Sequence, residues 1–173
     1  MAITDIKLQP LEVNWNATDL GSTIGGMELA VEVQSQDLLT DQTGSAPADS
    51  FFTGVVVNVT VTLLELNTAN YTQMIAQASG GSKAGDDATV YGWGSSRNFT
   101  SMLSSAQILR LRPVGNGSDE SEDITFWKAL PIVDSLSFSA DSARSMSVTF
   151  RCFIDSSKDS GVSLFAVGDV TGI

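Results

Sequence analysis

The sequence predicts a mainly β protein in which one helix packs against a sheet. Ser, Thr, Gly, Val and Asp are frequent while only 17% of the residues are charged, a balance that favours strands over helices. Two segments alternate strictly between apolar and polar residues, and one shorter segment has the helical period. The length of 173 residues suffices for one core. Since no composition break or internal repeat divides the chain, we expect a single domain over residues 1–173.

The first clear strand follows the glycine pair Gly25 and Gly26, which suits a tight turn or a positive φ. Four apolar residues alternate with four others in a period of two, as in a strand with one buried face. The apolar set is Met27, Leu29, Val31 and Val33, and the opposite set is Glu28, Ala30, Glu32 and Gln34.

A long polar loop is expected next, over about residues 34–50. Loops of this length inside a compact domain are usually functional or disordered. The residues in it that we single out are Asp37, Leu38, Leu39, Asp41, Gln42 and Pro47.

The strongest strand signal is FFTGVVVNVTVTLLEL, residues 51–66. One face carries Val55, Val57, Val59, Val61 and Leu63, and the other carries Val56, Asn58, Thr60 and Thr62. The segment is longer than the usual strand of ~5–6 residues. Such length favours an extended hairpin or a sheet that continues beyond one subunit.

A helix of about three turns should follow, because Tyr71, Met74, Ile75 and Ala78 form an apolar stripe at helical spacing. Asn67 or Thr68 is a suitable N-cap, and the glycines at 80 and 81 end the helix. The Gly-rich stretch of about residues 80–97 is expected to be irregular.

Further strands are expected in AQILRLRPV, DITFWKALPIV, SMSVTFRCFID and GVSLFAVGD, and we expect seven or eight strands in the whole chain. Pro131 should end or break its strand, since proline cannot donate to a ladder. The acidic turn with Asp119, Glu120, Glu122 and Asp123 matches no calcium loop, and we expect it to be solvated.

Two compositional absences argue against an enzyme. The chain has no histidine, so Ser-His-Asp and Cys-His sites and His-containing zinc sites are excluded. Cys152 is the single cysteine and lies on an apolar face, which predicts a buried thiol rather than a nucleophile. The adjacent Asp86 and Asp87 should point apart and are a poor acid–base pair. We therefore expect no catalytic residue, no metal and no cofactor.

The net charge of −11 disfavours binding to phosphate backbones. It is consistent with simple solubility or with a surface that must not adhere to a polyanion. Residues 1–13 lack the features of a secretory signal, and no apolar run approaches the ~20 residues of a membrane span.

Three further residues are candidates for contacts between subunits. Trp93 lies between two glycines in a loop, whereas Trp15 and Trp127 suit either a core or an interface. Arg110 and Arg112 occupy the polar face of their strand and are suited to pair with acidic residues of a neighbouring subunit.

The order of these segments resembles the tail tube proteins of bacteriophages with long non-contractile tails. The resemblance runs from about Leu20 to Asp169, over LGSTIGGMELAVEV, TDQTGSAPAD, TGVVVNVTVTLLEL, the helix, ITFWKALPIVDSLSFSADSARSMSVTFRCFIDSS and LFAVGD. The order of these pieces carries the resemblance. The stretch GGSKAGDDATVYGWGSS has no counterpart in it.

The resemblance implies a β-sandwich or barrel-like subunit with the helix outside the sheet. Six copies would join their sheets around a ring, and rings would stack into a hollow tube in the virion tail, assembled in the host cytoplasm. The loop of residues 34–50 would reach the adjacent ring. Tape measure and terminator proteins would be partners, and DNA would pass through without specific binding. Glu28, Glu32, Asn58, Thr60 and Thr62 are the candidates for the lumen.

The sequence leaves two alternative functions open. One is another virion ring protein, such as a tail terminator, an adaptor or a capsid decoration protein. The other is a carbohydrate-binding β-sandwich or a carboxylate-based hydrolase, although no strand presents an evident acid pair with flanking aromatic residues.

Overall fold

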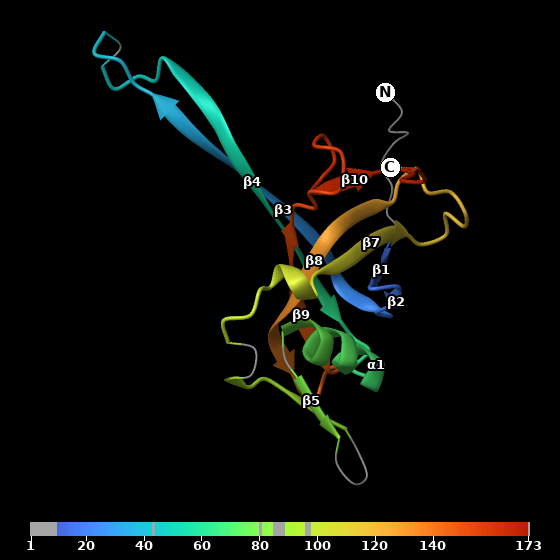
Figure 1. Ribbon diagram of the computed structural model, residues 1–173. Coiled ribbons are helices and arrows are strands. Elements are labelled where there is room, and N and C mark those ends of the chain that lie inside the picture. Colours follow the sequence, from blue (N-terminus) through green and yellow to red (C-terminus); the bar gives the residue numbers. More distant parts are fainter. Residues whose placement is uncertain (1–9, 43, 80, 85–88, 96–97, 173) are drawn as a thin grey trace.

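A computed structural model describes residues 10–42, 44–79, 81–84, 89–95 and 98–172. It confirms a mainly β fold with one helix (Figure 1). The strands are β1 (Leu11–Trp15), β2 (Thr18–Asp19), β3 (Thr23–Leu38), β4 (Asp49–Leu63), β5 (Gly81–Ala84), β6 (Thr89–Gly92), β7 (Gln107–Pro113), β8 (Ile124–Ser137), β9 (Ser145–Phe153) and β10 (Phe165–Val167). The expectation of seven or eight strands was too low, because the additional strands are short.

One antiparallel sheet forms most of the molecule, in the order β2-β1-β7-β8-β9-β4-β3. β10 pairs with the beginning of β8 and continues the line of β9 along the same edge. The sheet curls around a single core that includes Trp15 of β1, Val59 of β4, Phe126 of β8 and Phe150 of β9. Side chains from strands near both ends of the sheet therefore pack together in one barrel-like interior.

Residues 20–22 close this barrel at one corner by linking the two edge strands β2 and β3. The Leu20 amide donates to the carbonyl of Val13, and the Leu64 amide donates to the carbonyl of Ser22, both at 2.9 Å. The Glu65 carboxylate accepts hydrogen bonds from the Ser22 amide at 3.0 Å and hydroxyl at 3.1 Å. The hydrogen-bonded ladder thus continues from β1 to the end of β4 across the corner.

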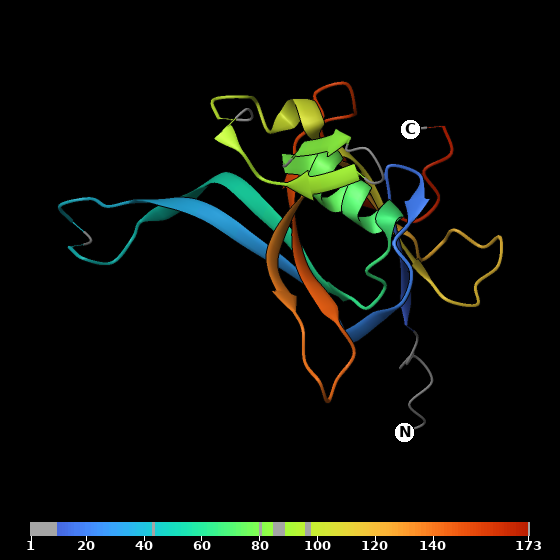
Figure 2. The same cartoon turned by 90° about the horizontal axis from the view of Figure 1, so that it is seen from below.

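β3 and β4 form a hairpin that is longer than the rest of the sheet. β4 pairs with β3 along its whole length but with β9 only from Asn58 to Leu63. The distal part of the hairpin, residues 34–54, extends beyond the body, and we call it the arm (Figures 1 and 2). The expectation of a loop over residues 34–50 was wrong, because β3 continues to Leu38 and β4 begins at Asp49. Both faces of the arm are exposed, so the periodicity that identifies a half-buried strand is absent there.

The expected helix consists of α1 (Thr68–Tyr71) and the π-helical η1 (Thr72–Ser79). The Asn67 side chain accepts from the Asn70 amide and caps the helix as predicted. Met74 and Ile75 are buried, and the helix lies against the sheet (Figure 2). The buried Asn70 side chain donates to the carbonyl of Leu20 at 2.9 Å, which ties the helix to the closed corner.

Two other expectations were wrong. The stretch of residues 80–97 is not wholly irregular, because β5 and β6 form a hairpin beside the helix and Tyr91 stacks on Tyr71 with ring centroids 6.2 Å apart. Pro131 does not end a strand and lies in the middle of β8, opposite Phe150. The pairing of β8 with β7 stops at Ala129, so Pro131 lies where β8 has one strand partner.

The closed corner predicts that Gly21→Ala destabilises the protein by about 2 kcal/mol. Gly21 has φ of +79°, and an added Cβ would clash with the Glu65 carboxylate, whose displacement would break its hydrogen bonds to Ser22. Gly44→Ala is the matched control, because Gly44 also has a positive φ of +62° but has open space. Urea unfolding measures both variants. Equal losses would show that the contact with Glu65 does not matter.

Candidate functional site

The five predicted lumen residues lie on one face of the sheet, opposite the core side of β4. Glu28 is paired with Thr60, and Ala30 is paired with Asn58. Thr60, in turn, is paired with Thr149 of β9. The structure therefore brings Glu28, Glu32, Asn58, Thr60 and Thr62 together on one surface, as strand parity predicted.

A chain of polar side chains crosses this face. The hydroxyl oxygens of Thr60 and Thr149 are 3.2 Å apart, and the Thr149 hydroxyl donates to the Asp134 carboxylate at 2.6 Å. These groups satisfy one another across three strands and fix the side chains in this part of the face. The sequence did not reveal Asp134, because it lies at a bulge of β8.

The part of the sheet formed by β3, β4, β9 and the second half of β8 has two free edges. Among the described residues, no strand pairs with the outer edge of β3 or with β8 beyond Ala129 on the side away from β9. Both edges belong to one antiparallel sheet of four strands. An exposed edge of this length is a template for pairing with another chain.

The exposed part of β3 is apolar on one face. Leu29, Val31 and Val33 continue the face of Val59, Val57 and Val55, to which they are paired. Val57 and Val59 are buried, whereas Val31 and Val33 are 47% and 61% exposed. The apolar face that forms the core in β4 therefore continues onto β3, an edge strand that no other element covers in the described structure. The alternating sequence predicted burial here, and one subunit does not provide it.

The predicted inter-ring residues lie near the end of the arm. Asp37 and Leu38 belong to β3, and the connection of residues 39–48 carries Leu39, Asp41, Gln42 and Pro47. The Ser50 hydroxyl donates to the Asp37 carboxylate at 2.5 Å across the two strands. Leu38 and Leu39 are 46% and 58% exposed, so the arm presents apolar as well as acidic side chains.

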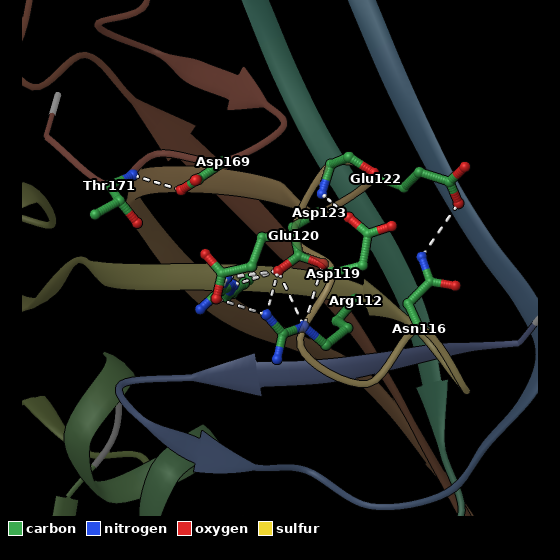
Figure 3. Close-up of polar contacts among 10 residues, drawn as sticks. Arg112, Asn116, Asp119, Glu120, Glu122, Asp123, Asp169 and Thr171 are labelled. Carbon is green, nitrogen blue, oxygen red and sulfur yellow. Dashed lines mark hydrogen bonds and ion pairs between the residues drawn. The ribbon is translucent and has the colours of Figure 1, made fainter.

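The two candidate interface arginines pair within the chain (Figure 3). Arg110 and Arg112 lie 2.6 Å and 2.8 Å from the Asp123 carboxylate, and both contact Glu120. The side-chain hydrogen bonds to Asp123 and then to Glu120 raise the pKa of Arg112 above its usual value. The expectation of a wholly solvated acidic turn was therefore wrong for Asp123, which is fully buried. The cluster fixes the turn to β7.

The three tryptophans separate into core and surface. Trp15 and Trp127 are buried, and their indole nitrogens donate to the carbonyls of Ala129 and Val162 at 2.8 Å and 2.7 Å. Trp93 is 52% exposed. Its exposure keeps Trp93 as the candidate for a contact with another molecule.

The described part of the chain shows no metal centre and no membrane-spanning helix. No group of three or more His, Cys, Asp or Glu side chains there is arranged to hold a metal ion. No helix in the described ranges has the length and apolarity needed to cross a membrane. Asp86 and Asp87 lie outside the described residues.

Sequence comparisons do not assign the chain to a family. No protein-family model matches it. No curated protein is similar to it in sequence.

The arginine cluster predicts that Asp123→Asn lowers the free energy of unfolding by about 2 kcal/mol. The substitution leaves two guanidinium groups with one charged partner fewer. The loss is limited because the two arginine side chains are 31% and 24% exposed. Glu122→Gln in the same turn is the control, since its side chain still accepts from Asn116. Thermal unfolding of the two variants checks this. A stable Asp123→Asn protein would contradict a role for the cluster in holding the turn.

Burial predicts that Cys152 is unreactive in the folded protein. Its side chain is buried as the sequence predicted, and desolvation raises the pKa of the thiol to about 12. At pH 8 the thiolate that reacts with iodoacetamide is therefore scarce. Mass spectrometry should find little alkylation until urea unfolds the protein. Rapid alkylation without denaturant would contradict the buried position.

Proposed function

We propose that this protein is a virion structural protein that assembles into stacked rings and forms the tube of a phage tail. The single observation that carries the proposal is the four-stranded antiparallel sheet with two free edges, one of them flanked by an uncovered apolar face. The resemblance in segment order supports the same assignment. The role is structural rather than catalytic.

The strand polarity supports closure into a ring. In the order β8-β9-β4-β3, the two outer strands run in opposite directions because neighbours are antiparallel. When copies are related by rotation about an axis along the strands, β3 of one copy therefore meets β8 of the next in antiparallel orientation. Each junction would pair the backbone groups of two free edges and cover Val31 and Val33. If the rotation between neighbouring copies returns to the first copy, the copies form a closed ring.

The arm supports stacking of such rings. It extends past the ends of β9 and β8 in the strand direction, so it would project beyond its own ring. Leu38 and Leu39 would then be covered by the adjacent ring. Contacts of this kind are heterologous, and they repeat from ring to ring without closing.

The polar face supports a lining that lets DNA pass. It combines hydroxyl and amide groups with three carboxylates, those of Glu28, Glu32 and Asp134, and with one cation, Arg151, which is paired with Asn58. Carboxylates repel phosphates, and lysine is absent from β3 and β4. A strand of DNA would meet little attraction along such a wall. We therefore assign this face to the lumen.

Electron microscopy of the purified protein tests the assignment. Rings and tubes are expected with the native chain, whereas Val33→Asp should remain monomeric, because a charge on the uncovered face cannot be buried at the junction. Val33 is exposed in the single subunit, so the free energy of unfolding should change by less than about 0.5 kcal/mol.

Glu32→Gln is the matched control, because Glu32 immediately precedes Val33 in β3, points to the polar face and should not affect the junction. Native protein that stays monomeric at high concentration would count against a ring-forming role. Val33→Asp protein that assembles normally would show that the rings, if present, use another surface.

A further inference from the structure

A groove lies at the base of the arm, where the sheet is incomplete. β9 ends at Phe153, and β4 continues past it without a partner on that side. β10 resumes the line of β9 only after residues 154–164. The space between the unpaired part of β4 and β10 has a volume of about 570 Å³.

The groove is lined mainly by apolar side chains and by one carboxylate. Phe52, Ile154 and Val167 line it and are 67%, 60% and 64% exposed. Asp169 is the ionisable residue among the described lining residues, and it is exposed. The hydroxyl and amide of Thr171 hydrogen-bond to this carboxylate and lower its pKa, so it is negative at neutral pH (Figure 3). A complementary partner would insert an apolar side chain that carries a positive charge beside it.

The opposite end of the same sheet presents such a group. Residues 138–144 connect β8 to β9, and the pairing of Leu63 with Met146 places this turn at the end of β4 away from the arm. Phe138 is 61% exposed, and the Arg144 guanidinium lies 5.7 Å from the centre of its ring. The arginine and the ring therefore form one exposed unit that is aromatic and cationic.

The charge distribution favours this turn as the partner. Residues 8–82 contain eight acidic side chains and no Lys or Arg, so the arm that flanks the groove is purely acidic. Arg110 and Arg112 are already paired with carboxylates. Arg144, by contrast, is exposed on a projecting turn, whereas the other exposed cations among the described residues, Lys83 and Arg151, lie within strands β5 and β9.

We propose that the β8–β9 turn of one copy docks into the groove of a copy in the adjacent ring, with Phe138 in the apolar space and Arg144 beside Asp169. This inference rests on the proposed stacking of rings and names the two surfaces that meet. Within one copy they cannot meet, because they lie at opposite ends of the sheet and the turn and the arm project separately (Figure 2).

Disulfide trapping tests the contact directly. Ser139→Cys places a thiol beside Phe138, and Ser160→Cys places one in the groove lining, both at exposed positions. Under mild oxidation, a mixture of the two proteins should yield disulfide-linked dimers that neither protein yields alone. A mixture of Ser139→Cys with Ser118→Cys, an exposed position outside the groove, is the control and should yield none.

Microscopy separates this contact from ring formation. Phe138→Ala and Arg144→Glu should each give rings without tubes, while Asp141→Asn in the same turn should give tubes. The groove assignment would be overturned if the Phe138→Ala protein forms tubes as the native protein does and the mixture yields no disulfide. The proposed function would then remain intact. Native protein with neither rings nor tubes would overturn both.

Discussion

The structure depends on the unequal pairing of β4 with its two neighbours. β3 follows β4 over its full length, whereas β9 follows it only between Asn58 and Leu63. Where all strands are present, the sheet curls over a core of fully buried side chains such as Phe150 and Val59. Where β9 is absent, the same hairpin becomes an exposed arm with a groove at its base. One mismatch in strand length thus produces both the stable body and the surfaces that a single copy leaves uncovered.

The core of the body is built from side chains of one chain. Residues 20–22 connect the two edge strands and continue the ladder, and Glu65 holds this corner through Ser22. Asn70 joins the helix to the same place. Because the core is complete in one chain, changes on the arm or on the outer edge of β3 should alter assembly without unfolding the subunit. This separation makes the proposed contacts accessible to single substitutions.

The sequence predicted those elements that have one buried face. Alternation in residues 27–33 and 55–63 identified β3 and β4, and the helical stripe with its Asn67 cap identified α1 and η1. The strand residues of the arm before residue 51 were not predicted as strand, because residues such as Gln36 and Asp37 are exposed on either face. The shared face of the lumen candidates followed from parity. The burial of Asp123 did not, since it depends on two arginines that the fold brings to the same turn.

The absence of Lys and Arg between residues 8 and 82 has a consequence for the order of encounters in solution. Two arms that approach each other bring carboxylates against carboxylates, and no ammonium or guanidinium group of the arm offsets the repulsion. Random aggregation through the exposed leucines and phenylalanines of the arm is therefore opposed at low ionic strength. Salt would screen this repulsion over distances beyond ~10 Å and would remove part of the protection. In the proposed assembly, the acidic arm would give growth a direction, because arms repel one another while the groove at the base of the arm would accept the β8–β9 turn of another copy.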